Sequence, residues 1–319
     1  MQYKTGQSVS FAGFRLSLLK TILRRAYDNP WLLIALSCVF WAGNTVAARG
    51  SIGEISPMLM VTARWAIACV ILLVVARRQL VEAWPVLSPH WKRIALMGFF
   101  GFTVFQALYY VSAYYTTGVN LAIIQGVSPV LMLVGAWLLW GARVGAMQIG
   151  GFALTMVGVA LVATRGDLLA LRDLDFRIGD LGVLGSAIVY AGYALSLRNR
   201  PKAPAMGFFV IMVFAGLFTS LPLLIWEMLA GRVFAPTLTG WAALLYAAIF
   251  PSLLAQLFFI RSVELIGPSR VALVYNVTPV MGAIFAVILL SEPFEPHQAL
   301  ALALVIGGVI IAERFGKPS

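Results

Sequence analysis

The sequence predicts an all-α integral membrane protein, and three observations support this fold class. Of the 319 residues, 61% are hydrophobic and only 11% are charged, a composition far from that of a soluble globular domain. The apolar residues form runs close to the roughly 20 residues that cross about 30 Å of hydrocarbon. An internal duplication divides the chain into two halves. Together they predict ten transmembrane helices in two inverted five-helix repeats.

A basic N-terminal segment precedes the predicted spans. Residues 1–30 lack the apolar run of a signal peptide and predict a cytoplasmic amphipathic segment on the membrane surface, with an organelle transit peptide as the alternative. The first repeat is expected at 31–164, an extracytoplasmic linker at 165–179, the second repeat at 180–313 and a cytoplasmic tail at 314–319. The spans are expected at 31–48, 57–76, 94–115, 119–139, 145–163, 180–197, 206–227, 239–262, 269–290 and 296–312.

The duplication is clearest between residues 106–162 and 256–312, which align without a gap. Thirteen of the 57 positions are identical. Matches between leucines, alanines and valines carry little weight in apolar segments. The paired prolines and glutamines carry more, and they are Pro129 with Pro279, Gln106 with Gln256, and Gln148 with Gln298.

The distribution of cations predicts the orientation. The N-terminus, the even-numbered loops and the C-terminus hold seventeen lysines and arginines, and the odd-numbered loops hold five. Under the positive-inside rule, both termini are cytoplasmic. Because each half has five spans, the second half enters the membrane upside down relative to the first. Inverted repeats are typical of alternating-access transporters, although channels with inverted repeats also exist.

Several short motifs stand at characteristic places in the two halves. They are Phe40-Trp41-Ala42-Gly43-Asn44, Ala63-Arg64, Gly267-Pro268-Ser269-Arg270-Val271-Ala272, Thr278-Pro279-Val280 and Leu290-Ser291-Glu292-Pro293. With these motifs the chain resembles the ten-span EamA-type members of the drug/metabolite transporter superfamily. The resemblance implies a carrier in a bacterial-type plasma (inner) membrane, most often an exporter of amino acids or related compounds. Some relatives move sugar derivatives, nucleosides or drugs.

One position departs from the pattern of this family. The acidic residue that follows the long apolar run is present in the second half as Glu292, but its first-half equivalent is Ala142. We expect Glu292 to cap or tether a helix end rather than to touch substrate.

Polar and aromatic side chains inside the spans are the candidates for a central substrate cavity, because polar groups in lipid are costly and face the protein interior. The candidates are Trp41, Asn44, Gln106, Tyr109, Tyr110, Gln125, Tyr190, Tyr193, Gln256, Tyr275 and Asn276. Alternatively, the amides could only join helices. Pro129 and Pro279 each free a backbone carbonyl and are expected to bend their helices. Arg64 could receive a carboxylate, but a structural role is favoured.

The charges that are missing from the spans also bear on function. Neither Asp nor Glu stands near the middle of any span, which argues against proton-coupled export of cations. We therefore expect facilitated export of small neutral or zwitterionic molecules, with amino acids, aromatic ones included, as the first guess. The alternatives are a proton-coupled exporter of drugs or of nucleoside or sugar metabolites, and a pore-forming channel.

The remaining expectations concern partners and packing. The sequence predicts a small-molecule substrate and the lipid bilayer as partners, with no nucleic acid, cofactor, metal or enzymatic activity; monomer and homodimer both remain open. Stripes of small residues on the fifth and tenth spans let helices approach closely, so these spans are expected to brace the halves or to support a dimer contact. The stripes are Ala146, Gly150 and Gly158, and Ala299, Ala303 and Gly307.

Overall fold

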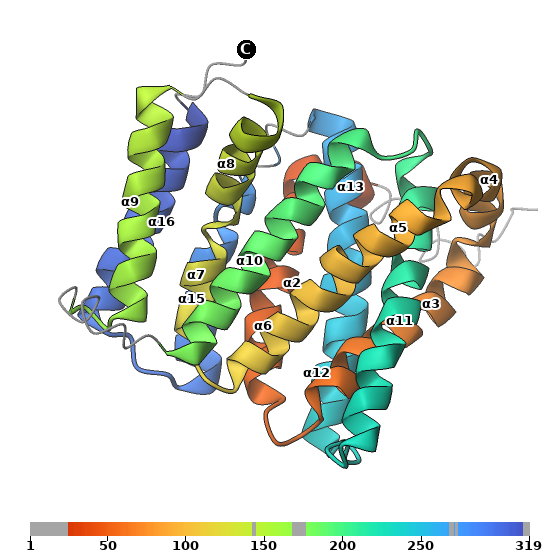
Figure 1. Cartoon of the computed structure of the whole chain (residues 1–319), viewed down its shortest axis with the longest axis horizontal. Coiled ribbons are helices and arrows are strands. Elements are labelled where there is room, and N and C mark those ends of the chain that lie inside the picture. The colour runs from red at the N-terminus through yellow and green to blue at the C-terminus, as the bar shows by residue number, and fades with distance from the viewer. Residues whose placement is uncertain (1–24, 142–144, 168–176, 268–270, 272–273, 315–319) are drawn as a thin grey trace, which may run out of the picture.

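The computed structural model describes residues 25–141, 145–167, 177–267, 271 and 274–314, and these residues form helices and connections without a strand. The helices form an elongated bundle (Figure 1). Most of the predicted N-terminal segment, part of the linker and of the tail, Ala142 and most of the motif around Pro268 lie outside the described residues.

Within the described residues, seven helical segments are long and apolar enough to cross a membrane. They are α2 (Pro30–Gly50), α3 (Pro57–Val75), α4 to α6 (Arg77–Leu87, Trp91–Gly98 and Phe105–Ala113), α7 with α8 (Gly118–Gln125 and Ser128–Trp140), α10 (Ile178–Ser196), α11 (Ala205–Leu229), and α12 with α13 (Leu238–Ile249 and Ala255–Ile266). Three shorter apolar helices, α9 (Ala146–Ala163), α15 (Thr278–Leu290) and α16 (Pro296–Arg314), stand at the fifth, ninth and tenth predicted spans. The count of ten spans stays a prediction.

Helices of each half pack against helices of the other half. The first helix of the first half, α2, lies against α13 and α15 of the second half, and the first helix of the second half, α10, lies against α6 and α8. The second helices, α3 and α11, pack together, as do the fifth helices, α9 and α16. The start of α2 and the end of α16 lie at the upper end of the bundle in Figure 1. Which side of the membrane this end faces stays a prediction.

The duplicated residues share local geometry as well as identity. Gln148 and Gln298 each accept a 2.9 Å hydrogen bond from a backbone N–H three residues earlier, at the starts of α9 and α16. Such a bond satisfies one of the donors that a helix start leaves unpaired. At the other end of the preceding helices, Gly141 and Ser291 adopt the left-handed conformation, with φ of 63° and 53°. Gln148 and Gln298 therefore owe their shared position to helix capping.

The contact between α9 and α16 uses a different glycine from one of those predicted. A Cβ atom on Gly151 would lie 2.5 Å from the carbonyl oxygen of Gly308, and one on Gly158 would lie 2.8 Å from that of Ala301. Gly150 meets nothing within 4 Å. A Cβ atom on Gly307 would lie 3.9 Å from the Leu154 side chain of α9, an ordinary contact. The two spans pack together and Gly158 and Gly307 face the partner helix, whereas Gly150 does not, because one residue turns a helical face by 100°.

A helix stands before the third span, where the sequence predicts a connection. Residues Arg77–Leu87 form α4, with Ala83 and Leu87 buried and Val81 and Trp84 exposed. Ala83 and Leu87 stand one helical turn apart, and Ala83 packs against Gly207 of α11.

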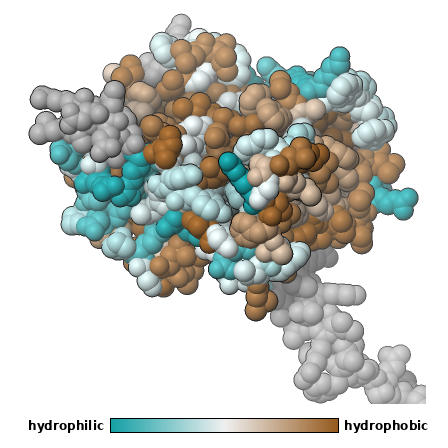
Figure 2. Space-filling model, turned by 60° about the horizontal axis from the view of Figure 1, so that its bottom comes forward, coloured by the Kyte–Doolittle hydropathy of each residue, from teal (hydrophilic) through white to brown (hydrophobic). Residues whose placement is uncertain are grey.

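The outer surface of the bundle is rich in apolar side chains. Val74 and Leu229 are more than three-quarters exposed, an arrangement that suits contact with lipid rather than water. Figure 2 turns the lower end of the bundle towards the viewer and shows patches of hydrophilic residues among apolar ones.

Candidate functional site

A cavity lies between the two halves of the bundle, and ten of the eleven predicted residues line it. These are Trp41, Asn44, Gln106, Tyr109, Gln125, Tyr190, Tyr193, Gln256, Tyr275 and Asn276. Pro129 and Pro279 also line it, each in the first turn of a helix that restarts after a short break. Tyr110 is the exception, because it is buried and its hydroxyl bonds to Asn44 Oδ1 at 2.9 Å, behind the lining.

The lining comes from equivalent places in both halves. Trp41 corresponds to Tyr190 and Asn44 to Tyr193 at an offset of 149, and Gln106 corresponds to Gln256 at an offset of 150. A site built in this way lies where the repeats meet, as in carriers made of inverted repeats.

Aromatic rings form much of the cavity wall. Trp41 and Tyr275 meet edge to face with centroids 5.4 Å apart, and Phe105 lies 5.0 Å from Tyr190. Phe102 stacks on Trp65 at 4.6 Å. Such rings offer apolar faces to a substrate and hold one another in place.

Arg64 joins three parts of the cavity wall. Its side chain is 1% exposed, and its guanidinium donates to Ser252 Oγ at 2.7 and 2.9 Å and to the Ala247 carbonyl at 3.2 Å. It also donates to Gln106 Oε1 and Tyr110 Oη, both at 3.1 Å, and to Asn44 Oδ1 at 3.4 Å. Arg64 therefore connects α3 with α2, α6 and the second half, and it lines the cavity as well.

Both halves have a π-helical turn beside the cavity. The turn Phe99–Val104 (η2) lies between α5 and α6, and the turn Phe250–Leu254 (η5) lies at the equivalent place between α12 and α13. Each gives a carbonyl to a tryptophan: the Trp65 indole donates to Phe102 at 3.2 Å, and the Trp41 indole donates to Pro251 at 3.1 Å. Single π turns are frequent at functional sites.

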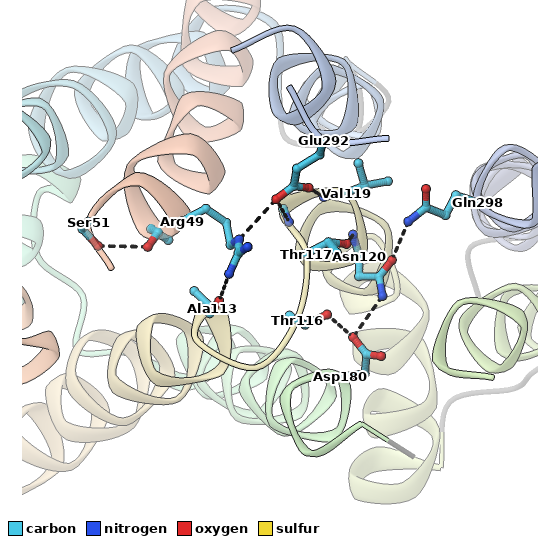
Figure 3. Close-up of polar contacts among 12 residues, drawn as sticks. Arg49, Ser51, Ala113, Thr116, Thr117, Val119, Asn120, Asp180, Glu292 and Gln298 are labelled. Carbon is cyan, nitrogen blue, oxygen red and sulfur yellow. Dashed lines mark hydrogen bonds and ion pairs between the residues drawn. The ribbon is translucent and has the colours of Figure 1, made fainter. Parts of the chain in front are cut away.

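A charged cluster joins the ends of α2 and α6, the start of α7 and the connection that follows α15. Glu292 accepts from Arg49 Nε at 3.2 Å and from the backbone N–H groups of Gly118 at 2.9 Å and Val119 at 3.1 Å. Arg49 also donates to the Ala113 carbonyl at 2.6 Å. Figure 3 shows Arg49 and Glu292 pointing towards one another above the start of α7. The expected role of Glu292 in tethering a helix end agrees with these contacts. We call Arg49, Glu292, Gly118 and Val119 the Arg49–Glu292 cluster.

A second polar group extends this end of the bundle. Asn120 accepts from Gln298 at 2.9 Å and donates to Asp180 at 3.3 Å, and Thr116 also donates to Asp180. All four side chains are buried. They join α7 to α10 and α16 (Figure 3).

The opposite end has a weaker counterpart of the Arg49–Glu292 cluster. Arg198, the equivalent of Arg49, stacks on the ring of Trp140 with 4.4 Å to the centroid. Arg261 pairs with Asp28 at 3.1 Å and with Glu264 at 3.3 Å.

Some lining residues were not singled out from the sequence. Three of them are aromatic residues that resemble ordinary lipid-facing or core residues of a span, namely Trp65, Phe102 and Phe105. Ser252 also lines the cavity. The signal that could have found it is Pro251, because a proline inside a span indicates a break in the helix beside which polar groups can lie.

A helical membrane bundle of two corresponding halves around a polar and aromatic cavity defines the class of multi-pass membrane transporters. The EamA-like transporter family matches residues 30–164 and again 177–313. This chain belongs to that family, and it is a multi-pass protein of the inner membrane, as predicted.

Curated relatives match over most of their length. The chain is similar to "Uncharacterized transporter YyaM" of Bacillus subtilis (strain 168), with 26% identity over 89% of this chain and 93% of the relative. It is also similar to an "Uncharacterized transporter" of Archaeoglobus fulgidus, with 24% identity over 88% and 96%. One solved structure, described as "Crystal structure of protein", has a TM-score of 0.62 over 91% of this chain and 99% of its own at 18% identity. That likeness shows the fold alone.

Proposed function

We propose that this transporter is a facilitative exporter of small neutral or zwitterionic metabolites, with amino acids, aromatic ones included, as the first candidates. The observation that carries the proposal is the cavity between the two halves, where aromatic rings and amides from equivalent positions converge. Among the described residues, no Asp or Glu lines this cavity. A proton-coupled exporter of cations would need such a carboxylate as its relay.

The proposed mechanism is alternating access between the two ends of the cavity. The Arg49–Glu292 cluster lies one helical turn below lining residues such as Thr45 and Ala122. We propose that this cluster holds the lower, extracytoplasmic end closed in the present conformation and separates when the cavity opens there. The paired π turns and the breaks before Pro129 and Pro279 are the places where the helices could bend.

The test is uptake into liposomes containing the purified protein. Labelled phenylalanine, leucine, uridine and glucose are offered with and without a pH gradient. We expect saturable amino-acid uptake that does not need the gradient. If no amino acid enters, the substrate proposal is wrong, and a strict need for the gradient would contradict facilitated transport.

Counterflow separates a carrier from a pore. Liposomes preloaded with unlabelled phenylalanine should accumulate labelled phenylalanine transiently. A carrier can bring one labelled molecule in and return with an unlabelled molecule bound, so it exchanges the two across the membrane. A pore gives no such overshoot, and its absence in liposomes that do transport would favour the channel.

A further inference from the structure

We propose that the substrate of this carrier bears a carboxylate, and that the amide nitrogens of Asn44 and Gln106 bind it under the positive charge of Arg64. This inference rests on the function proposed above and narrows it. It assigns the cavity to small organic carboxylates, including zwitterionic amino acids. Cations, and sugars or nucleosides without a carboxylate, would not fit.

The first step concerns the charge of Arg64. Every group that accepts a hydrogen bond from its guanidinium is neutral: three side-chain hydroxyl or amide groups from the first half, and a hydroxyl and a carbonyl from the second. In the part of the chain that the structure describes, no carboxylate pairs with Arg64 and no other charged side chain lines the cavity. A buried charge without a counter-ion is costly. An anionic ligand would supply the missing negative charge.

The second step concerns the direction of the two amides. A guanidinium only donates hydrogen bonds, so Asn44 and Gln106 must turn their oxygens towards Arg64. The distances are 3.4 Å from Asn44 Oδ1 and 3.1 Å from Gln106 Oε1 to the same guanidinium nitrogen. Asn44 Oδ1 also accepts from the Tyr110 hydroxyl at 2.9 Å. Both NH2 groups consequently stand on the far side of their amides from Arg64.

The third step is that these NH2 groups are free to bind a ligand. Both side chains line the cavity, and none of the described residues accepts a hydrogen bond from either amide nitrogen. The guanidinium of Arg64 polarises the two amides, so their NH2 groups form a pair of donors from which a carboxylate can accept hydrogen bonds. The aromatic rings of Trp41 and Tyr275 can then contact an apolar or aromatic side chain on the same ligand.

The experiment compares matched ligands on purified protein in detergent. The probes are 3-phenylpropanoate, L-phenylalanine, L-phenylalaninamide and 2-phenylethylamine, which keep one ring and differ in charge. Binding is measured by calorimetry. We expect the two carboxylates to bind at least about tenfold more tightly than the amide and the amine, since a hydrogen bond to a charged group is worth on the order of that factor.

Asn44→Asp tests the site without removing the hydrogen bonds around Arg64. The new carboxylate keeps the acceptor for Arg64 and Tyr110, so the fold should persist, but it neutralises the guanidinium and repels an anionic ligand. We expect binding of both carboxylates to fall about tenfold or more, with 2-phenylethylamine unchanged or tighter. Asn199→Asp makes the same change at an exposed position near the end of α10 and is the control. Circular dichroism and gel filtration confirm that both variants are folded.

Equal binding of carboxylate and amide by the wild type, or carboxylate binding that survives Asn44→Asp, would overturn the inference. So would the failure of all four probes to bind. Liposome uptake distinguishes this inference from the proposed function. Selective carboxylate binding without transport supports the inference and contradicts the carrier, whereas saturable uptake of L-phenylalaninamide as fast as L-phenylalanine supports the carrier and contradicts the inference.

Discussion

Replacing Glu292 by Gln should weaken the lower end of the bundle, and the structure sets the size of the effect. The Glu292 side chain is 10% exposed and accepts three charge-assisted hydrogen bonds, one from Arg49 and two from the start of α7. A glutamine keeps one acceptor oxygen and turns its NH2 group towards a donor. Hydrogen bonds to charged groups contribute about 1.5–3 kcal/mol each, and one partner here is partly exposed. We therefore expect a loss of about 2–4 kcal/mol from this end.

The consequence is a change in the balance between conformations. If the cluster is intact only when the lower end is closed, the loss shifts the equilibrium towards the open state by roughly 30- to 900-fold. The Arg198–Trp140 contact at the other end is worth only about 0.5–1 kcal/mol at an exposed site.

The assay is labelling of a single cysteine in the cavity. Thr45→Cys is introduced after the native cysteines, Cys38 and Cys69, are replaced by alanine, and intact cells receive a maleimide that does not cross membranes. Glu292→Gln should raise the rate of labelling from outside. Glu264→Gln, which removes an exposed pair with Arg261, should leave it unchanged, since such pairs contribute about 1 kcal/mol or less.

Two results would refute this reasoning. The first is labelling that Glu292→Gln does not change in a folded protein. The second is full rescue by the exchanged pair Arg49→Glu with Glu292→Arg. An arginine at position 292 cannot accept from the N–H groups of Gly118 and Val119, so the exchange should restore little of the cluster.

Two further predictions concern helix breaks and helix packing. Replacing both Pro129 and Pro279 by alanine should lower the rate of liposome transport while the thermal unfolding temperature changes little, because each proline stands where a helix restarts beside the cavity. A loss of transport that only follows a loss of folded protein would show that the prolines have a structural role. Gly151→Ala should destabilise the protein by about 1–3 kcal/mol through overpacking against α16. An alanine at Gly150 would meet no atom within 4 Å, so Gly150→Ala should leave stability unchanged or raise it by up to about 1 kcal/mol. Equal destabilisation by the two variants would contradict the packing.

The sequence indicated the class of fold and most of the cavity wall because both depend on simple patterns. Hydrophobic runs mark membrane helices, and polar residues within them tend to face inwards, so Gln106 and Gln256 could be placed before the structure was known. The π turn at Phe99–Val104 could not, because its sequence contains no proline that would mark a break in the helix. The partners of Arg64 come from segments up to 188 residues away, and spacing along one helix carries no information about them.

Orientation around a helix axis was the weakest part of the sequence reasoning. Gly150 and Gly151 are adjacent and identical, yet only one touches the neighbouring helix. Choosing between them requires the position of α16, which a stripe of small residues does not define.

The unequal ends of the bundle have a consequence for transport rates. A carrier that uses no energy cannot move solute against its gradient, so the ratio of maximal rate to half-saturating concentration must be the same from both sides. Unequal contacts at the two ends can still set the populations of the inward-facing and outward-facing conformations when no substrate is bound. The acid at position 292, matched by alanine at 142, would thus give this carrier different half-saturating concentrations on the two sides. Maximal rates would change by the same factor, and the final distribution of the solute would not change at all.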